Sequence, residues 1–219
     1  MNNINKGYID EYLSTMLPES NGYLKELELY AEANHIPIIG KDMAQLLRLL
    51  IKIHSPRNIL EIGTAIGYSA LIMAMAAGRD CNIITIERQQ DMVLLARDNI
   101  ARTEYANRIE VLNGVAEDIL PDLDKGFDLI FLDAAKGQYL QFFNHCKHLL
   151  RDGGLLISDN VLFKGMVASD DLVVRRKRTI VKRMREYLSH ISNLDGYESC
   201  IIPMGDGVAL TYKEGCRFE

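Results

Sequence analysis

The chain has 219 residues, of which 48% are hydrophobic and 25% charged, as is typical of soluble globular proteins rather than of disordered or fibrous ones. Its length favours one domain, residues 1–219, and its net charge of −5 argues against a surface coated in nucleic acid, although an average can hide a local basic patch. The sequence has no long apolar run and no basic segment followed by an apolar one at its N-terminus, so it predicts neither a membrane span nor an export signal. It also has no Cys-x-x-Cys pair, so neither a zinc site nor a disulfide framework is predicted. We expect a cytoplasmic location.

The first part of the chain is predicted to be helical. Apolar residues at helical spacing, such as Leu24, Leu27 and Ala31, indicate one hydrophobic helix face. We expect helices over residues 5–16, 22–35 and 40–54, before any strand of a sheet.

From Arg57 onward, short apolar runs alternate with amphipathic segments, a pattern typical of a parallel sheet with helical crossovers. The predicted strands cover residues 58–62, 82–87, 108–114, 127–133 and 154–160. The predicted helices cover residues 67–78, 89–104, 116–122, 137–150 and 170–193. The turn Gly205-Asp206-Gly207 separates two last strands, 199–204 and 208–213, which must be antiparallel because no helix joins them. The sheet is therefore expected to end in a reversed strand.

The first predicted strand runs into a turn with two glycines, Gly63 and Gly67. Such a turn lets the backbone approach a ligand, and the helix after it offers free N–H groups. Its spacing differs from the Gly-x-Gly-x-x-Gly of dinucleotide enzymes, and no Walker-type lysine follows. The next strand ends in Glu87, whose carboxylate can accept hydrogen bonds from both ribose hydroxyls of a nucleoside. A tight packing turn and a solvated strand end are the alternative interpretations.

Acidic and amide side chains end two later strands, in FLDAAK and ISDN. Asp133, Asp159 and Asn160 are expected to converge at the carboxyl edge of the sheet, where open α/β folds bind ligands. Two carboxylates and an amide oxygen form a hard, all-oxygen set that suits magnesium or a similar cation. The alternative is that Asp159-Asn160 only makes a turn.

These motifs, together with EIGTAIGYSA, TIE, ISDNVLFKG and PMGDGVAL in the same order, resemble the cation-dependent O-methyltransferase family that includes catechol and caffeoyl-CoA methyltransferases. The resemblance runs from about Tyr23 to Thr211. It implies an α/β, Rossmann-like class I methyltransferase fold with a seven-stranded doubly wound sheet, its last strand antiparallel. It also implies S-adenosylmethionine as donor, a cation (Mg²⁺, or Mn²⁺ or Ca²⁺) that chelates two neighbouring substrate oxygens, and a homodimer. Residues 1–55 would be a helical cap on a core of residues 56–219.

The resemblance also implies roles for single residues. The cofactor contacts would be Ile39, Glu61, Gly63, Tyr68, Ser69, Glu87, Ala116 and Asp133. The metal ligands would be Asp133, Asp159 and Asn160, and Lys136 matches the lysine proposed as the base in catechol enzymes, so that Lys136 and Asp133 form the catalytic pair. In one departure, Ala134 and Ala135 replace bulky aromatic and imidazole residues of the catechol enzyme, which puts a small flat catechol pocket in doubt.

Seven positive side chains follow the predicted metal loop within residues 175–185. Helical spacing places Arg175, Arg178, Lys182 and Arg185 in one row, opposite a core-facing row that begins at Val174. A solvated helix face is one interpretation, but unopposed positive charges repel one another unless an anion lies nearby. A phosphate-rich acceptor such as RNA or a coenzyme A thioester would supply it. The tentative RNA contacts are Arg175, Arg176, Arg178, Lys182 and Arg185.

The leading interpretation is methylation of 5-hydroxyuridine at the tRNA wobble position to 5-methoxyuridine, because the sequence most resembles the bacterial tRNA 5-hydroxyuridine methyltransferases of this family. The 5-hydroxyl and 4-carbonyl of that base are neighbouring oxygens that can chelate one cation. A small-molecule O-methyltransferase, acting on catechols, hydroxycinnamoyl thioesters or flavonoids, is the first alternative. A non-catalytic module that binds S-adenosylmethionine or RNA is the second, and the intact Asp133, Asp159 and Asn160 speak against it.

Overall fold

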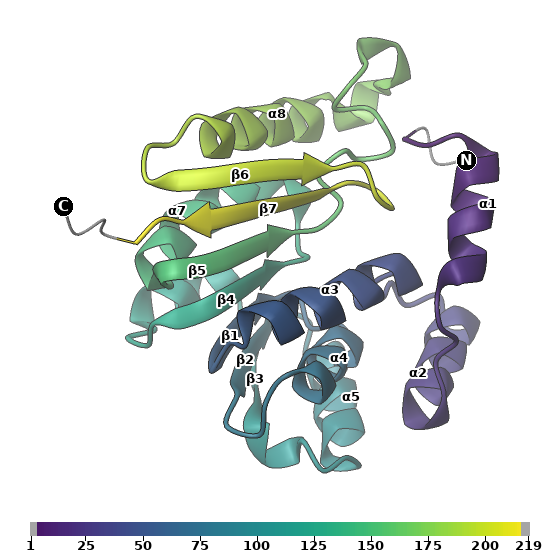
Figure 1. The fold of residues 1–219 in the computed structure, drawn as a ribbon, viewed down its shortest axis with the longest axis vertical. Coiled ribbons are helices and arrows are strands. Elements are labelled where there is room, and N and C mark those ends of the chain that lie inside the picture. Colours follow the sequence, from purple (N-terminus) through teal and green to yellow (C-terminus); the bar gives the residue numbers. More distant parts are fainter. Residues whose placement is uncertain (1–3, 216–219) are drawn as a thin grey trace. The chain divides into compact units, whose positions relative to one another are not determined.

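The structure is a computed structural model that describes residues 4–215 (Figure 1). Its strands are β1 (Asn58–Ile62), β2 (Asn82–Glu87), β3 (Ile109–Asn113), β4 (Phe127–Leu132), β5 (Leu150–Ser158), β6 (Tyr197–Ile202) and β7 (Val208–Lys213). They form a seven-stranded sheet in the order β3-β2-β1-β4-β5-β7-β6. The last strand, β7, is antiparallel to β5 and to β6, which confirms the predicted fold class. The reversed strand nevertheless lies inside the edge strand β6, and not at the end of the sheet as expected.

The described residues divide into two compact units, and the first contains residues 8–115. Its helices are α1 (Gly7–Met16), α2 (Gly22–Ala33), α3 (Lys41–His54), α4 (Tyr68–Ala76) and α5 (Gln90–Ala101). Strand β2 pairs in parallel with β1 and with β3. Isoleucines predominate in β1 and β2, and burial on both faces explains the nearly continuous apolar sequence of these two strands. Helix α4 packs against α3 and β2, and α5 against β2 and β3.

The second unit contains the remaining described residues, from Ala116 onward together with the segment before Tyr8. Its helical elements are α6 (Ala116–Ile119), η2 (Leu120–Asp122), η3 (Lys136–Gln138), α7 (Tyr139–Leu149), η4 (Asp170–Leu172), η5 (Arg175–Lys177) and α8 (Arg178–Ser192). Strands β4 and β5 are parallel, with Leu132 opposite Ser158 at their carboxyl ends. Helices α7 and α8 pack against each other, α7 also against β4 and β5, and α8 against β6 (Figure 1).

Two predicted boundaries differ most from the structure. Strand β5 begins at Leu150, four residues early, because the buried Leu150 pairs with Phe127. The predicted helix over 170–193 is broken, and its regular part starts only at Arg178. The Ser169 hydroxyl accepts a hydrogen bond from the Asp171 N–H and closes the short turn η4, after which the backbone is extended up to η5. Val174, predicted to face the core, is therefore 49% exposed.

In the part of the chain that the structure describes, no helix is long and apolar enough to cross a membrane.

Candidate active site

The glycine turn after β1 has the backbone conformation that its sequence predicts. Gly63 and Gly67 have φ angles of 105° and 83°, and Ala65 between them has a φ of 45°. At Gly67 a side chain would also crowd α5, because an added Cβ would lie 3.3 Å from the Ile100 side chain. The tight turn therefore leads directly into α4, and the N-terminus of this helix can face an anion or a polar ligand.

Glu87 holds this turn in place. One carboxylate oxygen accepts the Ala65 N–H at 3.1 Å, and the other accepts the Gln89 N–H at 2.9 Å. The Glu87 carbonyl also accepts hydrogen bonds from Asn113 and Gly114 beyond β3. The predicted ribose carboxylate is thus pre-oriented by backbone N–H groups, and each oxygen keeps a second lone pair for a ligand hydroxyl.

Glu61, another predicted cofactor contact, is fully buried in β1. It accepts a hydrogen bond of 2.5 Å from the Thr85 hydroxyl, and Thr85 also contacts the Thr64 hydroxyl at 2.5 Å. This buried polar chain lies beneath the turn and was missed by the sequence interpretation. Thr85 could have been noticed, because it is a polar residue in the otherwise apolar run NIITIE.

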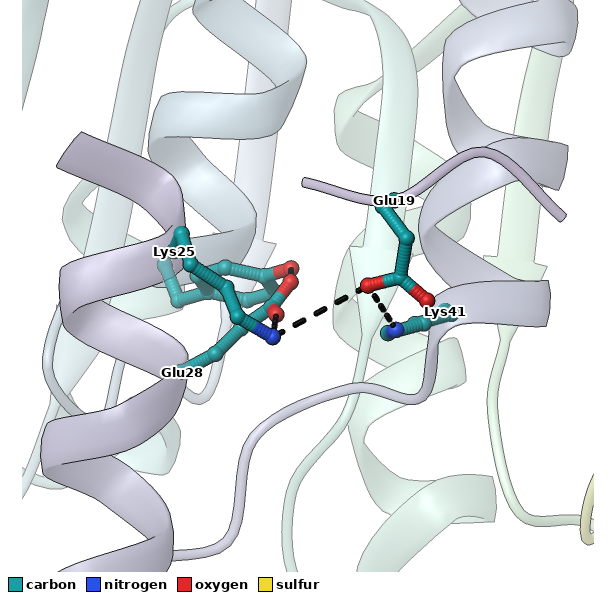
Figure 2. A network of polar contacts seen from close by, with 5 residues as sticks. Glu19, Lys25, Glu28 and Lys41 are labelled. Atoms are coloured by element: carbon teal, nitrogen blue, oxygen red, sulfur yellow. Dashed lines mark hydrogen bonds and ion pairs between the residues drawn. The ribbon is translucent and has the colours of Figure 1, made fainter. Parts of the chain in front are cut away.

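Tyr68 is tied to the N-terminal helices. Its hydroxyl donates a hydrogen bond of 2.6 Å to Glu28 in α2, and both burial and this bond raise the pKa of Tyr68 to about 12. Figure 2 shows the ion pairs around Glu28: Lys25 lies 3.5 Å from Glu28 and 3.8 Å from Glu19, which Lys41 contacts at 2.7 Å. Burial alone would raise the pKa of Glu28, but hydrogen bonds and Lys25 lower it. The Tyr68 hydroxyl thus donates its proton to Glu28 and joins α4 to α2.

Three further predicted cofactor residues are buried. Ile39, in the connection before α3, is 7% exposed, as is Ser69 in the first turn of α4. Ala116 begins α6 and has the same exposure.

The structure brings Asp133 and Asn160 together. They follow β4 and β5, and the Asn160 amide nitrogen donates a hydrogen bond of 3.1 Å to the Asp133 carboxylate. Asp159, 7% exposed, continues the ladder of the two strands, because its N–H donates to the Leu132 carbonyl at 2.9 Å. One Asp159 carboxylate oxygen accepts the Asn160 N–H at 2.6 Å. Burial raises the pKa of Asp133, while the Lys136 charge and the Asn160 hydrogen bond oppose this.

Residues 4–215 contain no group of three His, Cys, Asp or Glu side chains placed to hold a metal. The predicted ligand set does not require such a group, because its third member, Asn160, is an amide. Two carboxylates, the buried Asp159 and the partly buried Asp133, together with an amide oxygen fit a hard divalent cation, which would compensate their charge.

Tyr139, which the sequence interpretation did not single out, lies under these strand ends. Its ring is buried, and its hydroxyl donates to the Asp159 carbonyl at 2.9 Å and to the Leu132 carbonyl at 3.3 Å. Tyr139 packs edge-on against Tyr187 of α8, whose hydroxyl contacts Ser158 at 2.6 Å. These tyrosines connect α7 and α8 to the backbone that carries the predicted ligands.

Lys136 lies in η3, three residues after Asp133. Its ammonium group is 5.7 Å from the centre of the Phe163 ring, and that of Lys177 is 5.6 Å from the same ring. Phe163 is buried in a small cluster with Met166 and Val181. The predicted base is therefore held against an aromatic side chain of the segment that follows Asn160.

The basic segment is less uniform than predicted. Arg175 lies in η5 and not in α8, so the predicted row is not one α-helical face. Arg185 contacts the Asp170 carboxylate at 2.8 Å and donates to the carbonyls of Val167 and Met166, and Lys182 lies 3.8 Å from Glu186. These two charges are opposed, contrary to expectation. Arg175, Arg176 and Arg178 are exposed, and contacts of the segment with RNA remain a prediction.

A cavity of about 390 Å³ lies elsewhere in the second unit, lined by residues between Leu120 and Leu149 that include Lys125, His145 and His148. None of the predicted site residues lines it.

The fold is a seven-stranded mixed sheet with one antiparallel strand next to its edge, and comparison with known proteins specifies the class. The O-methyltransferase family model matches residues 14–214. The chain is 34% identical to a catechol O-methyltransferase of Niastella koreensis, over 78% of this chain and 80% of the relative. It is 32% identical to caffeoyl-CoA O-methyltransferase 2 of Zea mays, over 88% and 76%.

Solved structures of O-methyltransferases are also similar to this chain. The O-methyltransferase from Bacillus cereus in complex with SAH is 28% identical, with a TM-score of 0.83 over 94% of this chain and 97% of that one. The O-methyltransferase TomG from Streptomyces achromogenes, in complex with SAM, has the same identity and TM-score over 95% and 96%. The chain belongs to the O-methyltransferase family, which confirms the predicted enzyme class, an S-adenosylmethionine-dependent O-methyltransferase.

Proposed function

We propose that the protein transfers the methyl group of S-adenosylmethionine to one of two neighbouring oxygen atoms on a small phenolic acceptor, with a divalent cation, Mg²⁺ in the first place, held by Asp133, Asp159 and Asn160. The observation that carries the proposal is the 3.1 Å hydrogen bond between Asn160 and Asp133, which joins two of the three ligands. The names of the catechol and caffeoyl-CoA relatives support the acceptor class.

Each residue of the proposed site would have its own role in the reaction. Glu87 and the glycine turn would hold the nucleoside part of the donor. A divalent cation, when bound, would lower the pKa of the acceptor hydroxyl as a Lewis acid. Lys136, in its neutral amine form, would take the hydroxyl proton on its Nζ atom and become an ammonium group. The acceptor oxygen then bonds to the methyl carbon as the carbon–sulfur bond breaks, an in-line displacement that leaves S-adenosylhomocysteine.

The experiment compares acceptors that differ only in the placement of their oxygens. The purified protein is incubated with labelled S-adenosylmethionine, Mg²⁺ and catechol, caffeoyl-CoA, resorcinol or phenol. We expect label in catechol or caffeoyl-CoA, none in resorcinol or phenol, loss of activity with a chelator and recovery with added Mg²⁺. Equal labelling of phenol and catechol would contradict the role of paired oxygens.

A specific observation favours a second acceptor, 5-hydroxyuridine at the tRNA wobble position. Arg175, Arg176 and Arg178 are exposed in the segment that follows Asn160 and Phe163, where they could contact phosphates. The reported relatives are named for small phenolic substrates, so this acceptor stands second.

Charge reversal separates the two acceptors. The triple change of Arg175, Arg176 and Arg178 to glutamate should abolish methylation of tRNA that lacks 5-methoxyuridine and leave methylation of free catechol within about threefold. If the unaltered protein labels catechol but not tRNA, the proposed tRNA acceptor is wrong. The homodimer, the cytoplasmic location and the division into a cap of residues 1–55 and a core of residues 56–219 remain predictions.

A further inference from the structure

The segment after β5 has an unusual backbone. Asn160, Phe163 and Lys164 have φ angles of 59°, 46° and 58°, in the left-handed region that residues other than glycine rarely adopt. Such conformations persist only where the surrounding structure enforces them, and they concentrate at functional sites. This strained segment, residues 160–165, carries a proposed metal ligand at one end and the ring that contacts Lys136 in its middle.

The turn between β6 and β7 supplies that enforcement. The N–H groups of Val161 and Leu162 donate to the carbonyls of Gly207 and Asp206, each at 2.9 Å. The Asp206 carboxylate accepts a third hydrogen bond, from the N–H of Lys164, a strained residue. Asp206 is partly buried, which raises its pKa, while the Lys164 N–H and the charges of Lys136 and Lys164 act in the opposite direction.

Gly207 makes this close contact sterically feasible. An added Cβ at Gly207 would lie 2.4 Å from Cγ of Leu162, inside the contact distance of any side chain. The turn and the strained segment therefore fit together at two consecutive residues. Asp206 and Gly207 both accept hydrogen bonds through their carbonyls, Asp206 accepts one more through its carboxylate, and Gly207 leaves room for Leu162.

We propose that Asp206 is a positioning residue for the methyl-transfer site, because its carboxylate fixes the strained segment and through it Asn160 and Phe163. The inference rests on the proposed function. The contact of the Asp206 carboxylate that carries this role is the one with the Lys164 N–H. Position 206 then needs an oxygen that accepts a hydrogen bond, so asparagine should preserve the role of aspartate and alanine should not.

The test compares Asp206→Ala with Asp206→Asn, and Asp195→Asn is the control because Asp195 is exposed in the connection between α8 and β6. Binding of Mn²⁺ is measured by electron paramagnetic resonance without donor or acceptor. We expect Asp206→Ala to weaken Mn²⁺ binding about 10- to 100-fold, the range for residues that orient metal ligands. Asp206→Asn and the control should stay within about threefold of the unaltered protein.

Hydrogen exchange of the amides of residues 161–166 gives a second readout that needs no metal. Exchange should accelerate in Asp206→Ala and remain unchanged in Asp206→Asn. If Asp206→Ala does not fold, Gly207→Ala disturbs the same contact from the other residue and should accelerate the same amides. Unchanged exchange in folded Asp206→Ala, or an equal effect of Asp206→Asn, would overturn the proposal. If the unaltered protein binds no Mn²⁺, the proposed metal site fails, and exchange alone decides the role of Asp206.

Discussion

Replacing Tyr139 by phenylalanine removes a single oxygen atom from beneath the predicted metal ligands. That hydroxyl donates to the carbonyls of Asp159 and Leu132, while the ring makes an edge contact with Tyr187 at a centroid distance of 5.6 Å. Phenylalanine preserves the ring and its packing, so the change isolates the hydrogen bonds.

The expected loss of stability follows from burial, since the Tyr139 side chain is 1% exposed. Withdrawing a buried donor from carbonyls that cannot turn to water costs about 1–2 kcal/mol. For a protein of this length, that corresponds to a fall in the melting temperature of about 2–8 °C. Because the Asp159 carbonyl belongs to a proposed ligand, we also expect Mn²⁺ binding to weaken about tenfold.

Thermal unfolding followed by circular dichroism and titration with Mn²⁺ measure the two effects. Tyr187→Phe is the matched control, because its hydroxyl contacts the Ser158 side chain and not the backbone of a ligand. It should lower the melting temperature with little effect on Mn²⁺ binding. If Tyr139→Phe changes neither quantity, or Tyr187→Phe weakens Mn²⁺ binding equally, the reasoning is refuted.

Three further changes have distinct expected outcomes. Glu87→Gln places an amide donor against a backbone N–H, so calorimetry should show S-adenosylhomocysteine binding weakened by about 1.5–3 kcal/mol, and unchanged affinity would contradict the role of Glu87. Arg185→Met removes the contacts to Asp170 and to the carbonyls of residues 166 and 167 and should lower the melting temperature by about 2–4 °C, whereas the exposed Lys182→Met should change it by less than about 1 °C. Asp159→Asn should reduce methyl transfer more than about 100-fold while S-adenosylhomocysteine binding stays within about threefold; equal losses in both would indicate misfolding.

The parts of the fold that were predictable are those encoded by neighbouring residues. Apolar runs such as NIITIE specify strands, and the glycines of the turn after β1 specify its backbone, because both signals are local. The break before α8 was missed since the charged segment 175–185 continues a helical spacing, whereas Ser169 and the extended backbone beyond η4 decide the outcome.

The positioning contacts were beyond sequence reasoning for a different reason. The Asp206 carboxylate bonds to a backbone N–H 42 residues away, and Arg185 bonds to carbonyls 18 and 19 residues away. Backbone partners leave no trace in residue identity, so periodicity and motif spacing do not reveal them. Arg185 is an example: its guanidinium holds the segment before η4, a role that its place in a charged segment does not reveal.

The choice of asparagine at position 160 follows from the same geometry. Asp159 still extends the ladder between β4 and β5, and the chain must then turn sharply if the next side chain is to reach back to Asp133. The left-handed backbone of Asn160 makes that turn, and among residues with a side-chain oxygen, asparagine and aspartate tolerate it best. Aspartate would place a third carboxylate beside Asp133 and the buried Asp159. Asparagine supplies the oxygen without the charge, so one residue type meets both the conformational and the electrostatic requirement.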